Sequence, residues 1–374
     1  MIRFITIVAL LTVAQIAFSA EFQWSGKFER NLSAYNIFTD SANQIPNDSF
    51  LPYDVITPLF SDYADKHRFI YLPEGTSMTY DADAAFDMPV GAVLVKTFSY
   101  PFDARYPEQG RRLVETRLMV HTAKGWAGAA YLWNDEQTDA TLKIAGAEVP
   151  VDWIDEQGYC RSIKYLVPDM NQCKNCHRDT TGEMNPIGIK ARHLNRAAPK
   201  VDGASRSVPK SSHASEIPVN LSNNEDPRHH FPNQLDTWSQ TGILKNAPPS
   251  SEAPALPAAE NSALPIADRA MAYFEVNCAH CHNPKGLASH TRLDLRGMQS
   301  DPAARGVMKK PTASGNASRG RYFAIVPGNP DASFLVHRME SARPDVRMPP
   351  VGRTVPHAEG AELIRAWIAT LPPE

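Results

Sequence analysis

Two short cysteine and histidine motifs constrain this chain more than any other feature. They are Cys173-Lys-Asn-Cys176-His177 and Cys278-Ala-His-Cys281-His282. The chain has only 5 Cys and 12 His among its 374 residues, so a repeat of this pattern by chance is improbable. The spacing lets two thiols bond to the two vinyl groups of one haem, while the histidine that follows ligates the iron. The sequence therefore predicts two covalently attached haem c groups.

Three other kinds of site use a Cys-x-x-Cys pair. A zinc ribbon needs its two pairs roughly 15–20 residues apart, and these pairs lie much farther from each other. A thioredoxin-like dithiol sits in a βαβ context and has no use for the histidine. A small structural disulfide is the third alternative.

Residues 1–20 have the pattern of a signal peptide. Arg3 supplies the positive charge, residues 4–14 are apolar apart from threonines, and Ala17, Ser19 and Ala20 are small residues near a cleavage point. We expect cleavage and a periplasmic protein, with an uncleaved anchor as the alternative. No later segment is long and apolar enough to form an integral membrane span. Export also suits haem c, which bacteria attach outside the inner membrane.

Charge and the remaining cysteine limit the partners. The net charge is −3 and there is no long basic run, so we expect no nucleic-acid partner and instead redox partner proteins. Four cysteines are assigned to the two haems, which leaves Cys160. We expect this thiol to be buried and inert, with pairing to another chain as the alternative.

Residues 21–168 are predicted to form a β-rich domain. The run at 93–100 is β-branched and aromatic, and two further runs flank residues 122–125 as in a hairpin. Several short strands between turns predict an antiparallel, sandwich-like arrangement. The scattered polar residues of this region are expected to be surface or satisfied core groups. They are Asp62, Asp65, His67, Glu115 and His121.

Residues 169–246 are predicted to form the first haem segment. The Pro186 carbonyl is a candidate acceptor for the free ring nitrogen of His177. The pattern at 233–244 predicts a helix that closes this segment. The second axial ligand of the first iron stays open among four side chains: Met184, His193, His229 and His230.

Residues 247–263 are rich in Pro and Ala and are predicted to be a linker before a haem domain at 264–374. Amphipathic helices are expected at 266–277 and 359–370, with Phe274 near Trp367. Met348 precedes two prolines, which favour an extended loop that can lay a thioether over a haem. We therefore predict His282 and Met348 as the ligands of the second iron, with Met339 and Met298 as fallbacks.

The predicted fold class is multidomain α+β, with an antiparallel β sandwich-like domain followed by mainly α haem domains. Residues 266–372 resemble a class I cytochrome c domain. The chain after the signal peptide also resembles a family of exported dihaem c-type cytochromes. The resemblance rests on TPLFSDYADKHRF (57–69), VLVKTFSYP (93–101), ETRLMV (115–120), QCKNCH (172–177), PIGIKARHLNR (186–196), NQL (233–235) and CAHCHNPKG (278–286). It implies haem attachment at both motifs.

These observations favour an electron-transfer protein over a self-contained enzyme. The alternative is a dihaem peroxidase-like oxidoreductase, in which one haem keeps an open site for substrate. A third possibility is that the β-rich domain is a binding module that recruits a partner or glycan to the haems.

Overall fold

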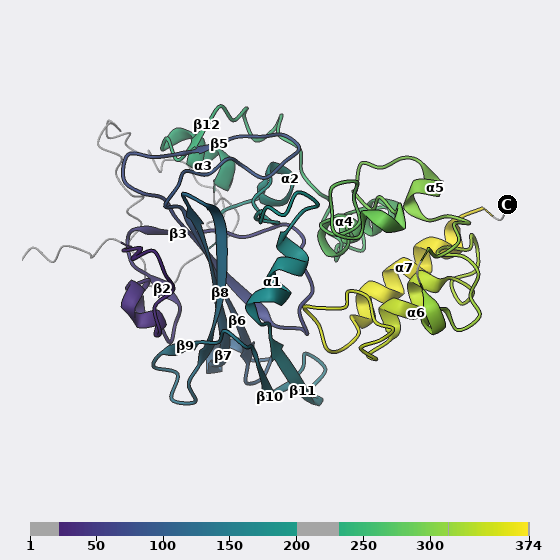
Figure 1. The fold of residues 1–374 in the computed structure, drawn as a ribbon, viewed down its shortest axis with the longest axis horizontal. Coiled ribbons are helices and arrows are strands. Elements are labelled where there is room, and N and C mark those ends of the chain that lie inside the picture. The colour runs from purple at the N-terminus through teal and green to yellow at the C-terminus, as the bar shows by residue number, and fades with distance from the viewer. Residues whose placement is uncertain (1–21, 200–231, 313, 373–374) are drawn as a thin grey trace, which may run out of the picture.

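The computed structural model describes residues 22–199, 232–312 and 314–372. The predicted signal peptide at 1–20 lies outside these residues, as do His229 and His230. A β-rich body carries the first motif, and a smaller body of helices and loops beside it carries the second (Figure 1). Within the described ranges, no helix combines the length and the apolar character that crossing a bilayer requires.

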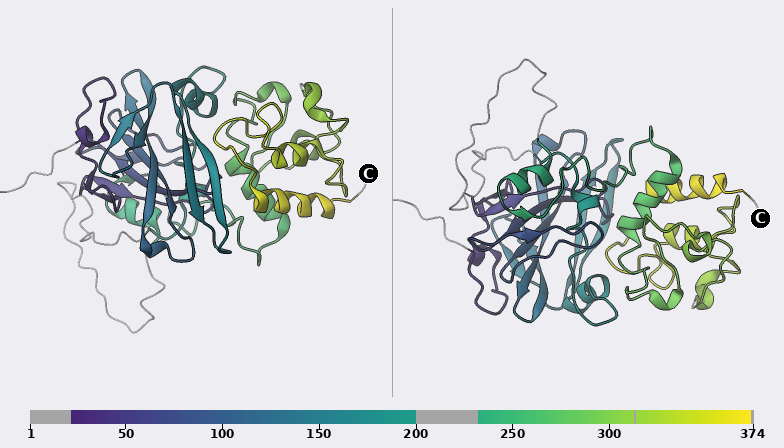
Figure 2. Two further views of the ribbon diagram at one scale, coloured as in Figure 1. Left: turned by 90° about the horizontal axis from the view of Figure 1, so that it is seen from below. Right: turned by 90° about the horizontal axis from the view of Figure 1, so that it is seen from above.

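A six-stranded antiparallel sheet forms the centre of the β-rich body (Figure 2). Its strands, in spatial order, are β3 (Phe50–Pro52), β4 (Asp65–Tyr71), β6 (Val93–Pro101), β7 (Arg111–Thr122), β8 (Gly125–Trp133) and β9 (Ala140–Leu142). β6 contains the run expected at 93–100. The predicted hairpin is confirmed, because Thr122 pairs with Gly125 where β7 turns into β8. Gly125 has a φ of +95°, a conformation that glycine adopts without strain.

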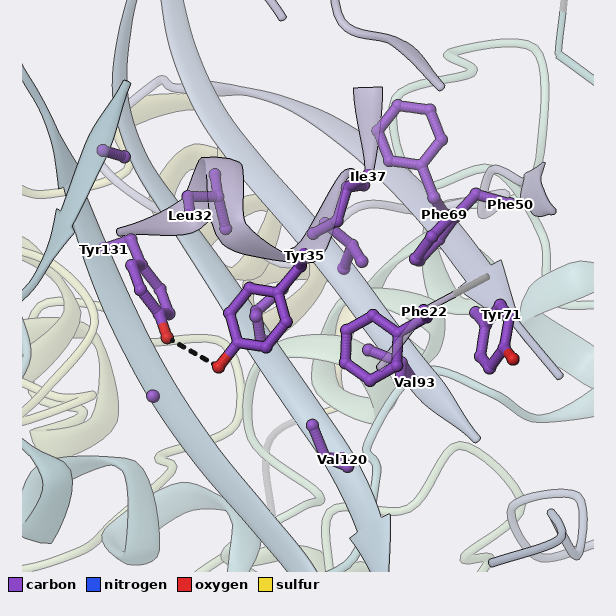
Figure 3. Close-up of a cluster of buried hydrophobic side chains, with 14 of the residues drawn as sticks. Phe22, Leu32, Tyr35, Ile37, Phe50, Phe69, Tyr71, Val93, Val120 and Tyr131 are labelled. Carbon is purple, nitrogen blue, oxygen red and sulfur yellow. Dashed lines mark hydrogen bonds between the residues drawn. The ribbon is translucent and has the colours of Figure 1, made fainter. Parts of the chain in front are cut away.

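One face of this sheet packs against an aromatic cluster from the N-terminal segment (Figure 3). Phe22 and Tyr35 stack at 5.1 Å between ring centroids, over Val93 and Val95 of β6. The Tyr35 hydroxyl lies 3.1 Å from that of Tyr131, so the buried polar atoms are paired. This face is closed by apolar packing and carries none of the predicted site residues.

The remaining strands form three two-stranded ribbons. β1 (Phe38–Asp40) pairs with β2 (Ile45–Pro46), β10 (Ala147–Ile154) pairs with β11 (Cys160–Val167), and β12 (Leu244–Lys245) runs parallel to β5 (Met78–Thr79). Two short 3-10 turns, η1 (Leu32–Tyr35) and η2 (Pro107–Gln109), complete the region.

Three short helices lie on the other face of the sheet, and the first of them carries the first motif. They are α1 (Met170–His177), α2 (Ala191–Leu194) and α3 (Gln234–Gln240). α1 lies against β8 (Figure 1). Ile189 and Leu235 belong to the same apolar cluster as Ile70 and Leu94 of the sheet. The first haem segment therefore shares its core with the sheet. Within it, α3 stops short of the predicted end at 244, because Gly242 turns the chain at a φ of +75°.

The C-terminal body has its own apolar core. Its elements are α4 (Ile266–Asn277), η3 (Ser289–Thr291), α5 (Pro302–Arg305), η4 (Gly315–Ser318), α6 (Phe334–Glu340) and α7 (Ala358–Thr370). α4 and α7 match the two predicted amphipathic helices. Phe274 and Trp367 meet edge to face at 5.5 Å, as expected, and they join the two ends of this body.

The predicted fold class is wrong in two respects. The described residues hold one large sheet with small ribbons, and helices together with the β10–β11 ribbon cover its second face, where a sandwich would place another large sheet. They contain twelve strands and seven α-helices, so the molecule is β-rich and mainly α haem domains are absent from these residues. In the C-terminal body α4 to α7 have 12, 4, 7 and 13 residues. Loops with many prolines separate them, and proline cannot continue a helix.

The Pro- and Ala-rich segment 247–263 lies against the β-rich body. Ala253 and Ala259 are buried, and the Thr57 hydroxyl donates a hydrogen bond to the Pro257 carbonyl at 3.1 Å. The backbone N–H of Ala259 donates to the same hydroxyl at 3.1 Å. These contacts tie the segment to the loop before β4, and the predicted domain limits on either side of it stay a prediction.

Candidate functional site

The first motif lies on one face of α1, which a capping box at its start stabilises. The Asp169 carboxylate accepts a hydrogen bond from the backbone N–H of Gln172 at 2.7 Å, and the Gln172 side chain accepts one from the Asp169 N–H at 3.1 Å. Residues three and four apart share one side of a helix. Cys173, Cys176 and His177 therefore project together, and all three line one cavity.

The His177 ring is oriented by a backbone carbonyl. Its Nδ1 lies 2.9 Å from the carbonyl oxygen of Asn185, and an oxygen of this kind can only accept, so Nδ1 carries the proton. The acceptor is Asn185, one residue earlier than the predicted Pro186. The backbone N–H of Asn185 donates to the His177 carbonyl at 2.8 Å, and this bond holds Asn185 beside the His177 ring. Burial lowers the pKa of His177 to about 4. The neutral ring thus keeps Nε2 as a free lone pair for a metal.

The second motif follows the end of α4 in a tight turn. His282 is 7% exposed, and its Nδ1 lies 3.1 Å from the hydroxyl of Thr291. That hydroxyl donates its own proton to the Ala288 carbonyl at 2.7 Å, so it must accept from His282. Burial lowers the pKa of His282 to about 4. His282 is therefore in the same tautomer as His177, with Nε2 free.

The two motifs meet in space, although Asn175 and Cys281 are 106 positions apart in the sequence. The Cys281 thiol lies 3.6 Å from the Asn175 carbonyl oxygen. Just beyond the motifs, the backbone N–H of Thr180 donates to the Lys285 carbonyl at 2.9 Å. Contact with the Cys281 thiol, followed by His280, lowers the pKa of the Cys176 thiol. The sequence alone gave no signal for this contact.

Two adjoining cavities surround the motifs. The larger has a volume of about 560 Å³, within the range of about 300–1,000 Å³ typical of ligand and cofactor sites, and it is lined by Cys278, Cys281 and His282. The smaller, of about 140 Å³, contains the first motif. Both are lined by Cys176 and His177, so the two cavities are neighbours at the first motif.

Met348 lines the larger cavity together with His282, which the predicted ligation by these two residues requires. Its backbone N–H donates to the Arg338 carbonyl at 3.0 Å. The guanidinium of Arg353, which is 3% exposed, donates to the Met348 carbonyl at 2.9 Å and to the Met339 carbonyl at 3.0 Å. Met339 also lines this cavity, whereas the other fallback, Met298, is exposed and lines neither.

Asp62 ties the Met348 loop to the β-rich body. Its carboxylate, 3% exposed, accepts hydrogen bonds from the backbone N–H groups of Thr354 at 2.7 Å and Val355 at 3.0 Å. Asp62 and Tyr63 both have positive φ, at 51° and 64°, a conformation that non-glycine residues rarely adopt. Sequence reasoning treated Asp62 as one of several scattered polar residues, because its partner Thr354 lies 292 positions away.

Two of the four candidates for the first iron's second ligand lie in the described residues, and both line the smaller cavity with His177. Met184 follows His177 closely, and its methyl group lies near Gly128 of β8. His193, on α2, is 4% exposed, and its Nε2 is buried without a hydrogen-bond partner in the described residues. The nearest acid, Glu275, is 3.7 Å from that nitrogen, beyond hydrogen-bond length.

The other polar candidates of the β-rich region differ from each other. Glu115 is fully buried but satisfied, since it accepts two hydrogen bonds from Arg117 and one from the Tyr165 hydroxyl. His67 contacts the Ser99 hydroxyl at 3.1 Å. Cys160 was predicted to be buried, and this prediction is wrong, because it is a free and exposed thiol at the start of β11.

The residues of both motifs fit covalently held haem. Each offers two free thiols and one neutral imidazole with an available Nε2, facing a cavity. In the described part of the chain, no group of three or more His, Cys, Asp or Glu side chains is arranged to hold a bare metal ion. No protein-family model, curated protein or solved structure matches this chain.

Proposed function

We propose that this chain is an exported dihaem c-type cytochrome that transfers electrons in the periplasm. One observation carries the proposal: two Cys-x-x-Cys-His motifs, far apart in the sequence, adjoin in neighbouring cavities with both histidines in the tautomer that leaves Nε2 for iron. The cleaved signal peptide at 1–20 is part of this proposal and rests on the sequence alone.

Cys173, Cys176, Cys278 and Cys281 would hold the haems, because addition of each S–H across one haem vinyl group would form a thioether and release nothing. When bound, the haems supply one-electron chemistry at iron. The chain's own contribution is to fix the ligands. Asn185 accepts the Nδ1 proton of His177, and Thr291 accepts that of His282. Each hydrogen bond fixes the orientation of its ring and leaves Nε2 available as a ligand.

For the second iron, His282 and Met348 are the proposed ligands. Arg353 donates a hydrogen bond to the Met348 carbonyl, and Asp62 accepts one from the backbone of Thr354 in the same loop. These bonds fix the backbone of the loop, so the position of the Met348 thioether does not depend on the metal. A thioether ligand raises the reduction potential of a haem. This site therefore suits an electron carrier, with no coordination position left for substrate.

For the first iron, His177 and His193 are the proposed ligands. His193 has a buried ring nitrogen with no hydrogen bond to compete for its lone pair, and it lines the same cavity as His177. Two nitrogen ligands place this haem at a lower potential than the second.

The contact between the motifs supports electron exchange within the molecule. Cys176 and Cys281, one thioether donor from each motif, touch one another, so groups attached at these two thiols would have neighbouring edges. Electrons can therefore enter at one haem and leave from the other. The redox partners are proposed to be proteins.

Spectroelectrochemistry of the purified mature protein, with and without carbon monoxide, tests this function. We expect two low-spin haems with separated potentials and no carbon monoxide binding to the reduced protein at neutral pH. Carbon monoxide binding at one iron would instead favour the peroxidase-like oxidoreductase. A protein without haem absorption would rule out both functions.

A further inference from the structure

A row of cationic side chains crosses the sheet beneath the first motif. Arg68 of β4 pairs directly with Lys96 of β6, and Lys96 pairs directly with Arg117 of β7. Neighbouring strands are about 4.8 Å apart, so the row spans roughly 10 Å. All three side chains line the smaller cavity, as does Lys66 two residues before Arg68.

This arrangement is unfavourable for the protein alone. Like charges directly opposite on adjacent strands repel each other. The row also separates two apolar clusters on this face of the sheet, one around Ile70 and Leu94 and one around Phe98. Burial, followed by the nearby charges of Arg68 and Arg117, lowers the pKa of Lys96 to about 7. The charged form of Lys96 is therefore unfavourable in this position.

Only part of this charge is neutralised. The Glu115 carboxylate binds Arg117 through two hydrogen bonds of 2.6 and 2.9 Å, and Asp54 binds Arg68 at 2.7 Å. Lys66 donates to a backbone carbonyl, that of Ala64, at 2.9 Å.

The Lys96 ammonium makes no hydrogen bond or ion pair with any described residue. The four cations therefore have two carboxylate partners between them. The wall of the cavity carries surplus positive charge, and an anionic ligand would compensate it.

The cavity already contains the attachment residues for a dianionic group. A haem carries two propionate carboxylates on the edge opposite its vinyl groups. α1, which carries the thiols, lies against β8, and the next strands in spatial order are β7, β6 and β4. Arg117 is therefore on the strand of the row nearest to α1, and Arg68 is on the farthest. The row therefore runs away from the thiols, and a haem attached there would carry its propionates on the edge farthest from them.

We propose that Lys96 and Arg68 bind the propionate carboxylates of the haem attached at Cys173 and Cys176. This inference rests on the proposed function, since it needs haem at the first motif. The two residues are positioning residues: they fix the haem in its cavity and place positive charge beside it. Positive charge near iron stabilises the ferrous state relative to the ferric state.

The test replaces Lys96 and compares the reduction potentials of the two haems. Lys96→Met removes the charge, Lys96→Arg keeps it, and Lys164→Met is the matched control on the exposed side of β11. We expect Lys96→Met to shift the ferric–ferrous equilibrium of the first haem about tenfold toward ferric, a fall of about 59 mV. Lys96 also lines the larger cavity, so the potential of the second haem should shift in the same direction but by less. Both potentials should stay close to the native values in the Lys96→Arg variant and in the control.

Several results would overturn the inference. One is an unchanged first potential in a Lys96→Met protein that intact mass shows to carry both haems. Another is a native potential that moves on adding acetate or phosphate at constant ionic strength, because the row would then bind a diffusing anion. Should Lys96→Met fail to mature, Lys96→Gln gives the same comparison. Native protein with no haem at Cys173 and Cys176 would instead contradict the proposed function itself.

Discussion

The two proposed haem-attachment regions are built differently, although their motifs have the same Cys-x-x-Cys-His pattern. The second motif lies in a body with its own core, in which Phe274 meets Trp367 and His282 is 7% exposed. The first motif lies on α1, which has no buried residue of its own, and its cavity wall is the face of the sheet. A Cys-x-x-Cys-His motif thus specifies the attachment chemistry. The reduction potential of an attached haem depends on the elements packed around it, which are the sheet for the first motif and the C-terminal core for the second.

Removing the thiols of each motif gives the largest expected contrast between the regions. Cys278→Ala with Cys281→Ala should remove one haem and destabilise the C-terminal body, because the larger cavity is then left without its filling group. Cys173→Ala with Cys176→Ala should also remove one haem, yet leave the sheet folded. Intact mass and thermal unfolding measure both effects, and equal unfolding temperatures for the two variants would contradict the comparison.

Replacing Met348 tests the ligation of the second haem. Met348→Leu removes the thioether that lines its cavity, so the potential of this haem should fall on the order of 0.1 V, within the range of about 0.8 V that axial ligands span. The reduced protein should then bind carbon monoxide at this iron. Met298→Leu is the matched control, since that methionine is exposed and lines neither cavity. No change in Met348→Leu would remove this residue as a ligand.

The first haem allows the parallel experiment. His193→Leu should open that iron to carbon monoxide and leave the second haem unchanged, because His193 lines only the smaller cavity. Met184→Leu serves as control, since it keeps the apolar volume near Gly128. If Met184→Leu opened the iron and His193→Leu did not, the two assignments would be reversed.

Asp62 couples the two regions, and its loss should have a smaller, conformational effect. Asp62→Asn replaces a buried carboxylate that accepts from two backbone N–H groups of the Met348 loop. We expect a loss of about 2 kcal/mol in the free energy of unfolding, typical of hydrogen bonds to a charged group. Chemical denaturation measures it. Asp65→Asn, at an exposed carboxylate on the same segment, should change it by less than about 0.5 kcal/mol.

The smallest effect is expected at Thr291. Thr291→Val removes the hydroxyl that accepts the His282 proton while keeping the shape of the side chain. We expect a shift of the second haem's potential smaller than that of Met348→Leu, with unchanged haem content. The first haem offers no equivalent variant, because a backbone carbonyl holds His177. An unaltered second potential would show that the hydroxyl does not tune His282.

Sequence patterns predicted the local features and missed the long-range ones. The helices at 266–277 and 359–370, the strand at 93–100 and the β7–β8 hairpin follow from side-chain periodicity and turn residues, and the structure has them. The class of the fold was wrong, because motif resemblance suggested helical haem domains where prolines break the chain into loops. The cationic row was also missed, since Arg68, Lys96 and Arg117 become neighbours only through strand register.

Contacts across the interface between the bodies could not be predicted either. Asp62 and Thr354, or Asn175 and Cys281, carry no local signal that they meet. The same holds for the hydrogen-bond acceptor of His177. It was predicted to be the Pro186 carbonyl, and it is the Asn185 carbonyl, one residue earlier in the loop. These features depend on packing, which a single sequence does not encode locally.

Intact-mass analysis of the mature protein, produced with a haem-attachment system, tests the central claim most directly. The account predicts a polypeptide that begins after the signal peptide and is heavier by two whole haem groups, with one on each pair of thiols in peptide maps. A mature chain of unmodified mass, with all five cysteines still reactive, would contradict it.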